Sequence, residues 1–190
     1  MTDFSKFRCK YLEPKDIQSK VDDLFKDFNI NIHEPIDIEL ITEKVGLQLD
    51  IRNLDYKYDA FLKVSKKEIA VNLVRYNDER YYNRLKFSLA HELGHFILHK
   101  DIMEFFSFDS LEEYIYFKQN ISDKEYSKFE WQANEFAGRI LVPEIIFKKE
   151  VANFLPDDWI NGFTFLNYLT DKFKVSENVI EIKLINYLKG

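Results

Sequence analysis

The chain has 190 residues, of which 46% are hydrophobic and 32% charged, and its 5 glycines and 4 prolines are too few for a disordered or loop-dominated protein. This length suits one domain, or one domain with an appendage, around a buried core. The formal charge of −6 argues against a duplex-binding protein, and the single cysteine, Cys9, excludes an internal disulfide and a cysteine-based zinc cluster. No apolar run approaches the roughly 18 residues of a membrane-spanning helix, and the N-terminus lacks an apolar signal core. We therefore expect a soluble, cytoplasmic protein.

Two helices and a small sheet are predicted in the first part of the chain. A helix begins near Asp16, where apolar residues recur at helical spacing at Ile17, Val21, Leu24, Phe25 and Phe28. Asp37 can cap a short second helix, and Gly46 suits the left-handed conformation that often follows a helix. Apolar and polar residues then alternate, which predicts three mostly antiparallel strands near 47–51, 60–64 and 69–73.

Helices are predicted for most of the remaining chain. A long helix over about 78–99 has a buried face made of Leu85, Leu89, Leu93, Phe96 and Ile97. Another covers roughly 128–141, and two more lie near 157–173 and 176–188. The irregular segment 102–117 is rich in Phe and Tyr, and it is either a lid or substrate groove or a further core helix.

The predicted elements define an α+β fold. With 18 Phe and 11 Tyr, much of the core must be aromatic. We predict a single domain over residues 1–190, with its core at about 16–143 and a C-terminal helical extension over 144–190.

Three of the four histidines fall within a nine-residue stretch of the long predicted helix, at His91, His95 and His99. His91 and His95 are four residues apart, so their rings leave the helix on one side and can bind the same zinc ion. Glu92 points about a hundred degrees away and is placed to act as a general base on water rather than as a ligand. This is the physical content of the H-E-x-x-H pattern.

A catalytic zinc ion needs a third protein ligand. Glu130 is one candidate, because it borders the apolar side of its own predicted helix; an ordinary carboxylate near a helix N-terminus is the equally simple alternative. Asn134, one turn later, can accept a hydrogen bond from a zinc-binding histidine, whereas Glu135 is expected to face solvent. His99 lies two turns from His91, too far to share an ion comfortably, so a position at the helix end or facing substrate is favoured.

Two blocks of sequence resemble a known family. The stretch Phe87–His99 (FSLAHELGHFILH) looks like the signature of the ImmA/IrrE metallopeptidases, and Glu130–Pro143 resembles that family's second motif. The likeness extends over about Ile17 to Leu188. Gln132 and Val142 depart from the residues common at their positions, and neither is expected to touch the chemistry.

The resemblance implies a zincin-like helical core, packed on the small sheet, in which one zinc ion (or another divalent metal) is held by His91, His95 and Glu130, with Glu92 as the base. Family members cleave helix-turn-helix repressors, often of phages or mobile elements, so the implied partner is a repressor rather than nucleic acid or membrane. The stabiliser of the oxyanion stays open among His99, Tyr114, Tyr116 and Arg139.

Two further functions are weighed against peptide hydrolysis. The chain could be a zinc-bearing binding module that sequesters a repressor, or one half of a toxin–antitoxin pair, without cleaving; an intact Glu92 favours catalysis. The two C-terminal helices could instead bind DNA, but the acidic balance of the chain disfavours this. The sequence leaves the oligomeric state undetermined.

Overall fold

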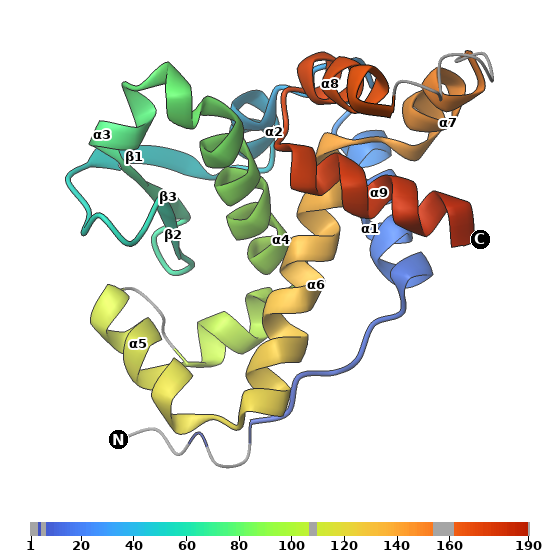
Figure 1. Ribbon diagram of the computed structural model, residues 1–190. Coiled ribbons are helices and arrows are strands. Elements are labelled where there is room, and N and C mark those ends of the chain that lie inside the picture. The colour runs from blue at the N-terminus through green and yellow to red at the C-terminus, as the bar shows by residue number, and fades with distance from the viewer. Residues whose placement is uncertain (1–3, 5–6, 107–109, 154–161, 190) are drawn as a thin grey trace.

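The computed structural model describes residues 4, 7–106, 110–153 and 162–189 (Figure 1). Its elements, in chain order, are helices α1 (Pro14–Asp27) and α2 (Ile38–Lys44), strands β1 (Gln48–Arg52), β2 (Ala60–Lys63) and β3 (Glu68–Asn72), helix α3 (Leu73–Tyr76), the 3-10 turn η2 (Glu79–Tyr81), and helices α4 (Tyr82–Phe106), α5 (Leu111–Asn120), α6 (Asp123–Leu141), α7 (Glu144–Asn153), α8 (Gly162–Phe173) and α9 (Glu177–Lys189). This arrangement is the predicted α+β fold.

The sheet is mixed, with strand order β1-β3-β2. Strands β2 and β3 form the expected antiparallel hairpin, but β1 pairs with β3 in parallel, with Asp50 opposite Ala70. The prediction of mostly antiparallel pairing is therefore corrected for this pair. Parallel and antiparallel strands show the same alternation of apolar and polar residues. The sequence pattern therefore does not reveal that β3 lies between β1 and β2 in the sheet.

Local capping sets where several helices begin. Asp37 caps α2 as predicted, because its side chain accepts a hydrogen bond from the amide of Leu40, and Gly46 follows that helix with a φ of +85°. Helix α6 begins at Asp123 rather than near 128, because Ser122 caps it. Helix α4 continues to Phe106, beyond the predicted end at 99.

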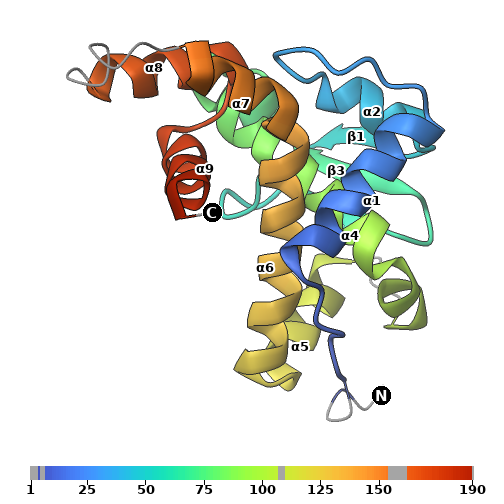
Figure 2. The same cartoon turned by 90° about the vertical axis from the view of Figure 1, so that its right-hand side faces the viewer.

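Aromatic side chains fill the core, as the composition predicts. The largest fully buried side chains include Phe117, Phe129, Phe136, Phe147 and Phe173. Helix α1 lies along α6, and α8 packs against α9 (Figure 2). The predicted helix 157–173 is observed as α8, and its residues 157–161 lie outside the described residues. Within the described part of the chain, no helix has the length and apolarity required to cross a membrane.

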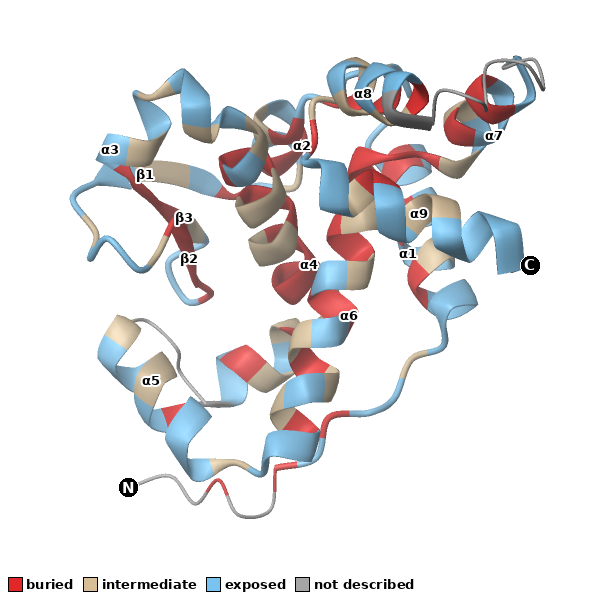
Figure 3. Ribbon diagram, viewed as in Figure 1, coloured by how far each residue is buried: buried red, intermediate tan, exposed pale blue. Residues whose placement is uncertain are grey.

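Helices α4 and α6 form the most extensive contact between elements, and their buried faces meet along the centre of the molecule (Figure 3). Gly94 allows this close approach. A Cβ atom at Gly94 would lie 3.1 Å from Cδ1 of Phe136 and 3.2 Å from the backbone oxygen of Ala133. The spacing between the two helices therefore depends on the absence of a side chain at this position.

We predict that Gly94→Ala destabilises the protein by about 1–3 kcal/mol, because the added methyl group overpacks the contact and outweighs the better helix propensity of alanine. Gly138→Ala is the matched control on α6, since nothing lies within 4 Å of a Cβ there. That change should stabilise the protein by about 0.5–1 kcal/mol. Urea unfolding measures both, and equal effects would contradict the proposed role of Gly94.

Candidate active site

Three potential metal ligands converge where α4 faces α6. One ligand atom from each of His91, His95 and Glu130 lies within 4.8 Å of the other two. The Nε2 atoms of the two histidines are 3.0 Å apart, and the Glu130 carboxylate oxygens lie 3.6 Å from Nε2 of His91 and 3.5 Å from Nε2 of His95. The structure thus brings together the three residues that the family resemblance implies as ligands of one ion.

This cluster opens into a cavity of about 200 Å³. Helix α4 forms one side, and α5, α6 and the strand β2 form the others. Besides the cluster, the lining includes Tyr58, Phe61, Glu92, Tyr114 and Tyr126. The cavity is therefore bounded by aromatic rings and contains a small group of polar side chains, as is common in catalytic sites.

The orientation of His91 is set from outside the cluster. Its Nδ1 atom is 2.9 Å from Oδ1 of Asn134, and an amide oxygen only accepts hydrogen bonds, so Nδ1 carries the hydrogen. Burial, the largest influence, lowers the pKa of His91 to about 4, and the imidazole is therefore neutral at pH 7. Its Nε2 lone pair faces the cluster, as binding to a cation requires.

Glu92 lies beside the cluster rather than in it. Its Oε2 atom accepts a hydrogen bond of 3.0 Å from the amide of Leu62 in β2. Burial raises the pKa of Glu92 to about 7, with His95 and Leu62 acting in the opposite direction. A carboxylate whose pKa lies near neutrality can both take up and release a proton, which suits a general base.

Tyr114 brings α5 to the site. Its hydroxyl group donates a hydrogen bond of 2.8 Å to Oε1 of Glu130. Burial and the nearby Glu130 carboxylate raise the pKa of Tyr114 far above its usual value, so the hydroxyl group stays protonated. Burial alone would raise the pKa of Glu130, but His95, His91 and Tyr114 together hold it at about 2. Glu130 is therefore ionised at pH 5 and above.

His99 is buried outside the cavity, so it cannot contact a substrate bound there. It is 2% exposed and does not line the cavity; its Nδ1 atom is 3.0 Å from Nδ1 of His95, and its Nε2 atom is 2.9 Å from Oε1 of Gln132. Burial lowers its pKa to about 3. This placement corrects the expectation that His99 faces substrate or lies at the helix end, and it shows that Gln132 contacts His99 without lining the cavity.

Two other candidates for stabilising an oxyanion have partners outside the cavity. Tyr116 packs edge-on against Phe4, with ring centroids 5.8 Å apart, and Arg139 pairs with Glu135 at 2.7 Å. Neither lines the cavity. Of the four candidates, only Tyr114 does, and Glu135 is held by Arg139 rather than facing solvent freely.

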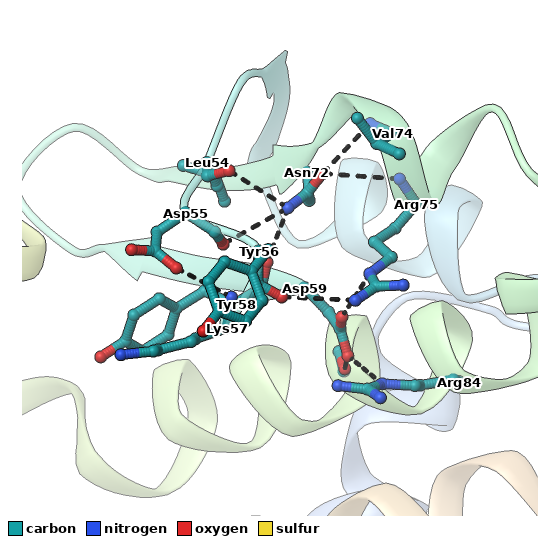
Figure 4. Close-up of polar contacts among 11 residues, drawn as sticks. Leu54, Asp55, Tyr56, Lys57, Tyr58, Asp59, Asn72, Val74, Arg75 and Arg84 are labelled. Carbon is teal, nitrogen blue, oxygen red and sulfur yellow. Dashed lines mark hydrogen bonds and ion pairs between the residues drawn. The ribbon is translucent and has the colours of Figure 1, made fainter.

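A polar network stabilises the wall formed by β2 and the loop before it (Figure 4). Asn72 donates a hydrogen bond of 2.9 Å to the carbonyl of Tyr58, and Asp59 accepts one of 2.5 Å from Nε of Arg84 in α4. Arg75 also lies 3.4 Å from the Asp59 carboxylate. These contacts fix the loop that carries Tyr58, and they fix the start of the strand whose Leu62 amide binds Glu92.

Comparison with known proteins gives the family. A peptidase family model described as the IrrE N-terminal-like domain matches residues 41–184. The chain belongs to this family. The match includes both helices that carry the cluster, so membership of a metallopeptidase-like family agrees with the His-His-Glu arrangement and implies a bound metal.

A solved structure supports the fold. The chain resembles a Mycobacterium tuberculosis transcriptional regulator with a TM-score of 0.58 and 15% sequence identity. The likeness covers 90% of this chain but 46% of the regulator, so this chain spans about half of that protein's length. No curated protein matches the chain.

The shifted pKa values predict how the metal-free protein responds to acid. Between pH 7 and pH 5, His91 and His99 stay neutral when folded but take up protons when unfolded, which lowers the free energy of unfolding. Glu92 acts oppositely, because it takes up a proton when folded but not when unfolded, and Glu130 is ionised in both states. The net result is a loss of about 1–2 kcal/mol.

Glu92→Gln removes the opposing contribution, so its loss over the same range should rise to about 3–4 kcal/mol. Urea unfolding in the presence of a chelator at both pH values measures the two losses. Equal losses in the two proteins would show that Glu92 does not protonate in this range.

Proposed function

We propose that the protein is a zinc-dependent endopeptidase in which His91, His95 and Glu130 hold the metal and Glu92 is the general base. The observation that carries this proposal is the convergence of two imidazole nitrogens and one carboxylate beside a fourth, protonatable carboxylate. Three protein ligands, with a further position left for water or substrate, are typical of catalytic rather than structural zinc sites.

The donor set fits zinc in chemistry and spacing. Zinc–nitrogen and zinc–oxygen bonds of about 2.0–2.1 Å in a tetrahedral arrangement place ligand atoms about 3.3 Å apart. The two Nε2 atoms are 3.0 Å apart, and they lie 3.6 and 3.5 Å from the two different oxygens of Glu130, Oε2 and Oε1 respectively. When bound, the metal supplies Lewis acidity, which polarises the scissile carbonyl group and makes water a stronger nucleophile near pH 7.

The chain's own residues supply proton transfer and positioning. Glu92, held by the Leu62 amide, takes a proton from the attacking water and delivers it to the nitrogen of the leaving amine as the peptide bond breaks. The Tyr114 hydroxyl group lines the same cavity, and it is our candidate donor to the oxyanion. Its single hydrogen is donated to Glu130, so this role requires the hydroxyl group to exchange that hydrogen bond for one to the oxyanion. Asn134 keeps His91 in the tautomer that presents Nε2.

We infer that the substrate is a helix-turn-helix transcriptional repressor. The support is the resemblance of the two sequence blocks to the ImmA/IrrE metallopeptidases, together with membership of the IrrE N-terminal-like family. The test is to incubate the zinc-loaded protein with the repressor encoded next to it and to look for a cut that a chelator prevents.

Glu92→Gln should retain zinc affinity but lower the rate of cleavage by roughly 10²–10⁴-fold, because the amide still accepts from Leu62 but cannot accept the proton from water. Glu135→Gln is the control on α6, since Glu135 pairs with Arg139 and does not line the cavity. It should cleave like the unaltered protein. Gel analysis of the repressor and a metal titration measure both properties.

The same variant separates hydrolysis from the binding alternative. If Glu92→Gln relieved repression as well as the unaltered protein does, without cutting the repressor, sequestration would replace cleavage as the function.

A further inference from the structure

The second metal-binding histidine has an outer connection that runs through three hydrogen bonds to the N-terminal segment. Nε2 of Gln132 donates to the carbonyl oxygen of Lys10 at 2.7 Å, Oε1 of Gln132 lies 2.9 Å from Nε2 of His99, and Nδ1 of His99 lies 3.0 Å from Nδ1 of His95. Gln132 is fully buried, and His99 and His95 are each 2% exposed. We call this chain of side chains the His95 relay.

The direction of each bond in the relay follows from its outer end. A backbone carbonyl only accepts hydrogen bonds, so the amide nitrogen of Gln132 must face Lys10 and its oxygen must face His99. That oxygen accepts as well, so Nε2 of His99 carries the hydrogen. In a neutral imidazole the other nitrogen is then an acceptor, and Nδ1 of His99 must receive a hydrogen from Nδ1 of His95.

The last step fixes the tautomer of the ligand. With its hydrogen on Nδ1, neutral His95 has a lone pair on Nε2, the atom that faces His91 and Glu130. The ring of Phe129 packs against both imidazoles, with centroids 4.3 Å from each, and so restrains their planes. If His95 carried its hydrogen on Nε2 instead, Nδ1 of His99 would have to donate. Nε2 of His99 would then be an acceptor facing the Oε1 acceptor of Gln132.

We propose that the N-terminal segment at Lys10 positions His95 for metal binding through Gln132 and His99, both of which act as positioning residues. The proposal rests on the metal site of the proposed function. It adds a contribution from outside residues 41–184, which are the part that the family model matches.

The N-terminal segment is itself held against α6. Glu125 accepts a hydrogen bond of 2.7 Å from the amide of Cys9, and Lys128 donates one of 3.0 Å to the carbonyl of Cys9. The Lys10 carbonyl is thereby held at a defined position next to Gln132. Because the segment is anchored independently of the histidines, a variant at its anchor can be compared with a variant in the relay.

The first test measures metal affinity. Gln132→Met keeps the volume but removes the acceptor for His99, and we expect zinc and cobalt affinity to fall by about 10–100-fold in competition with a chromophoric chelator. Gln132→Glu still accepts from His99 but has no amide nitrogen to donate to Lys10, so it should recover only part of the affinity. Lys128→Met loosens the anchor of the Lys10 carbonyl and should lower the affinity in the same direction but by less. Glu135→Gln lies on the same helix outside the relay and should bind metal like the unaltered protein. Equal affinity in Gln132→Met would overturn the proposal.

The second test needs no variant. Long-range proton–nitrogen NMR of the metal-free, unaltered protein reports which ring nitrogen carries the hydrogen, and we expect Nδ1 for His95 and Nε2 for His99. The reverse assignment overturns the relay even if every variant fails to fold. If the unaltered protein shows these tautomers but binds neither zinc nor cobalt, the proposed metal function fails while the hydrogen-bond assignment stands.

Discussion

The structure depends on how closely α4 approaches α6. The cluster takes two of its side chains from α4 and one from α6, so the distance between the helices sets the distance between the groups. Gly94 lies one position before His95, and the atoms that a Cβ would meet belong to Ala133 and Phe136, on either side of Asn134. One small residue therefore fixes the packing of the core and the separation of the candidate ligands together.

Burial makes the cluster costly unless its polar groups have partners. Those partners lie outside the cluster: Asn134 for His91, His99 for His95, Tyr114 for Glu130 and the Leu62 amide for Glu92. The groups that face inward are two imidazole nitrogens and a carboxylate, which lie 3.0–3.6 Å from one another. A divalent cation compensates all of them at once, and this is why the arrangement suits a metal better than a purely structural hydrogen-bond network.

The sequence predicted the relations between residues that lie on the same helix. Spacing of three to four residues fixed the relation of His91 to His95, the buried faces of α4 and α6, and the position of Asn134 one turn after Glu130. It did not predict features that join distant segments. The parallel pairing of β1 with β3 has no periodic signal, and the contact of Gln132 with Lys10 joins residues 122 positions apart. Arg139 and Tyr116 were candidates for stabilising the oxyanion, and neither lines the cavity.

Helix α6 connects the ligand cluster with the N-terminal segment. Glu130 belongs to the ligand cluster and Asn134 contacts it, while three other residues of α6 contact the N-terminal segment: Glu125, Lys128 and Gln132. A displacement of that segment would leave Gln132 free to turn its amide, and His99 would then lose the acceptor that defines its tautomer. Because His95 has no other partner for Nδ1 among the hydrogen bonds of the described residues, the loss would reach the metal ligand directly. The N-terminal segment and the candidate ligand His95 are therefore linked through Gln132 of α6.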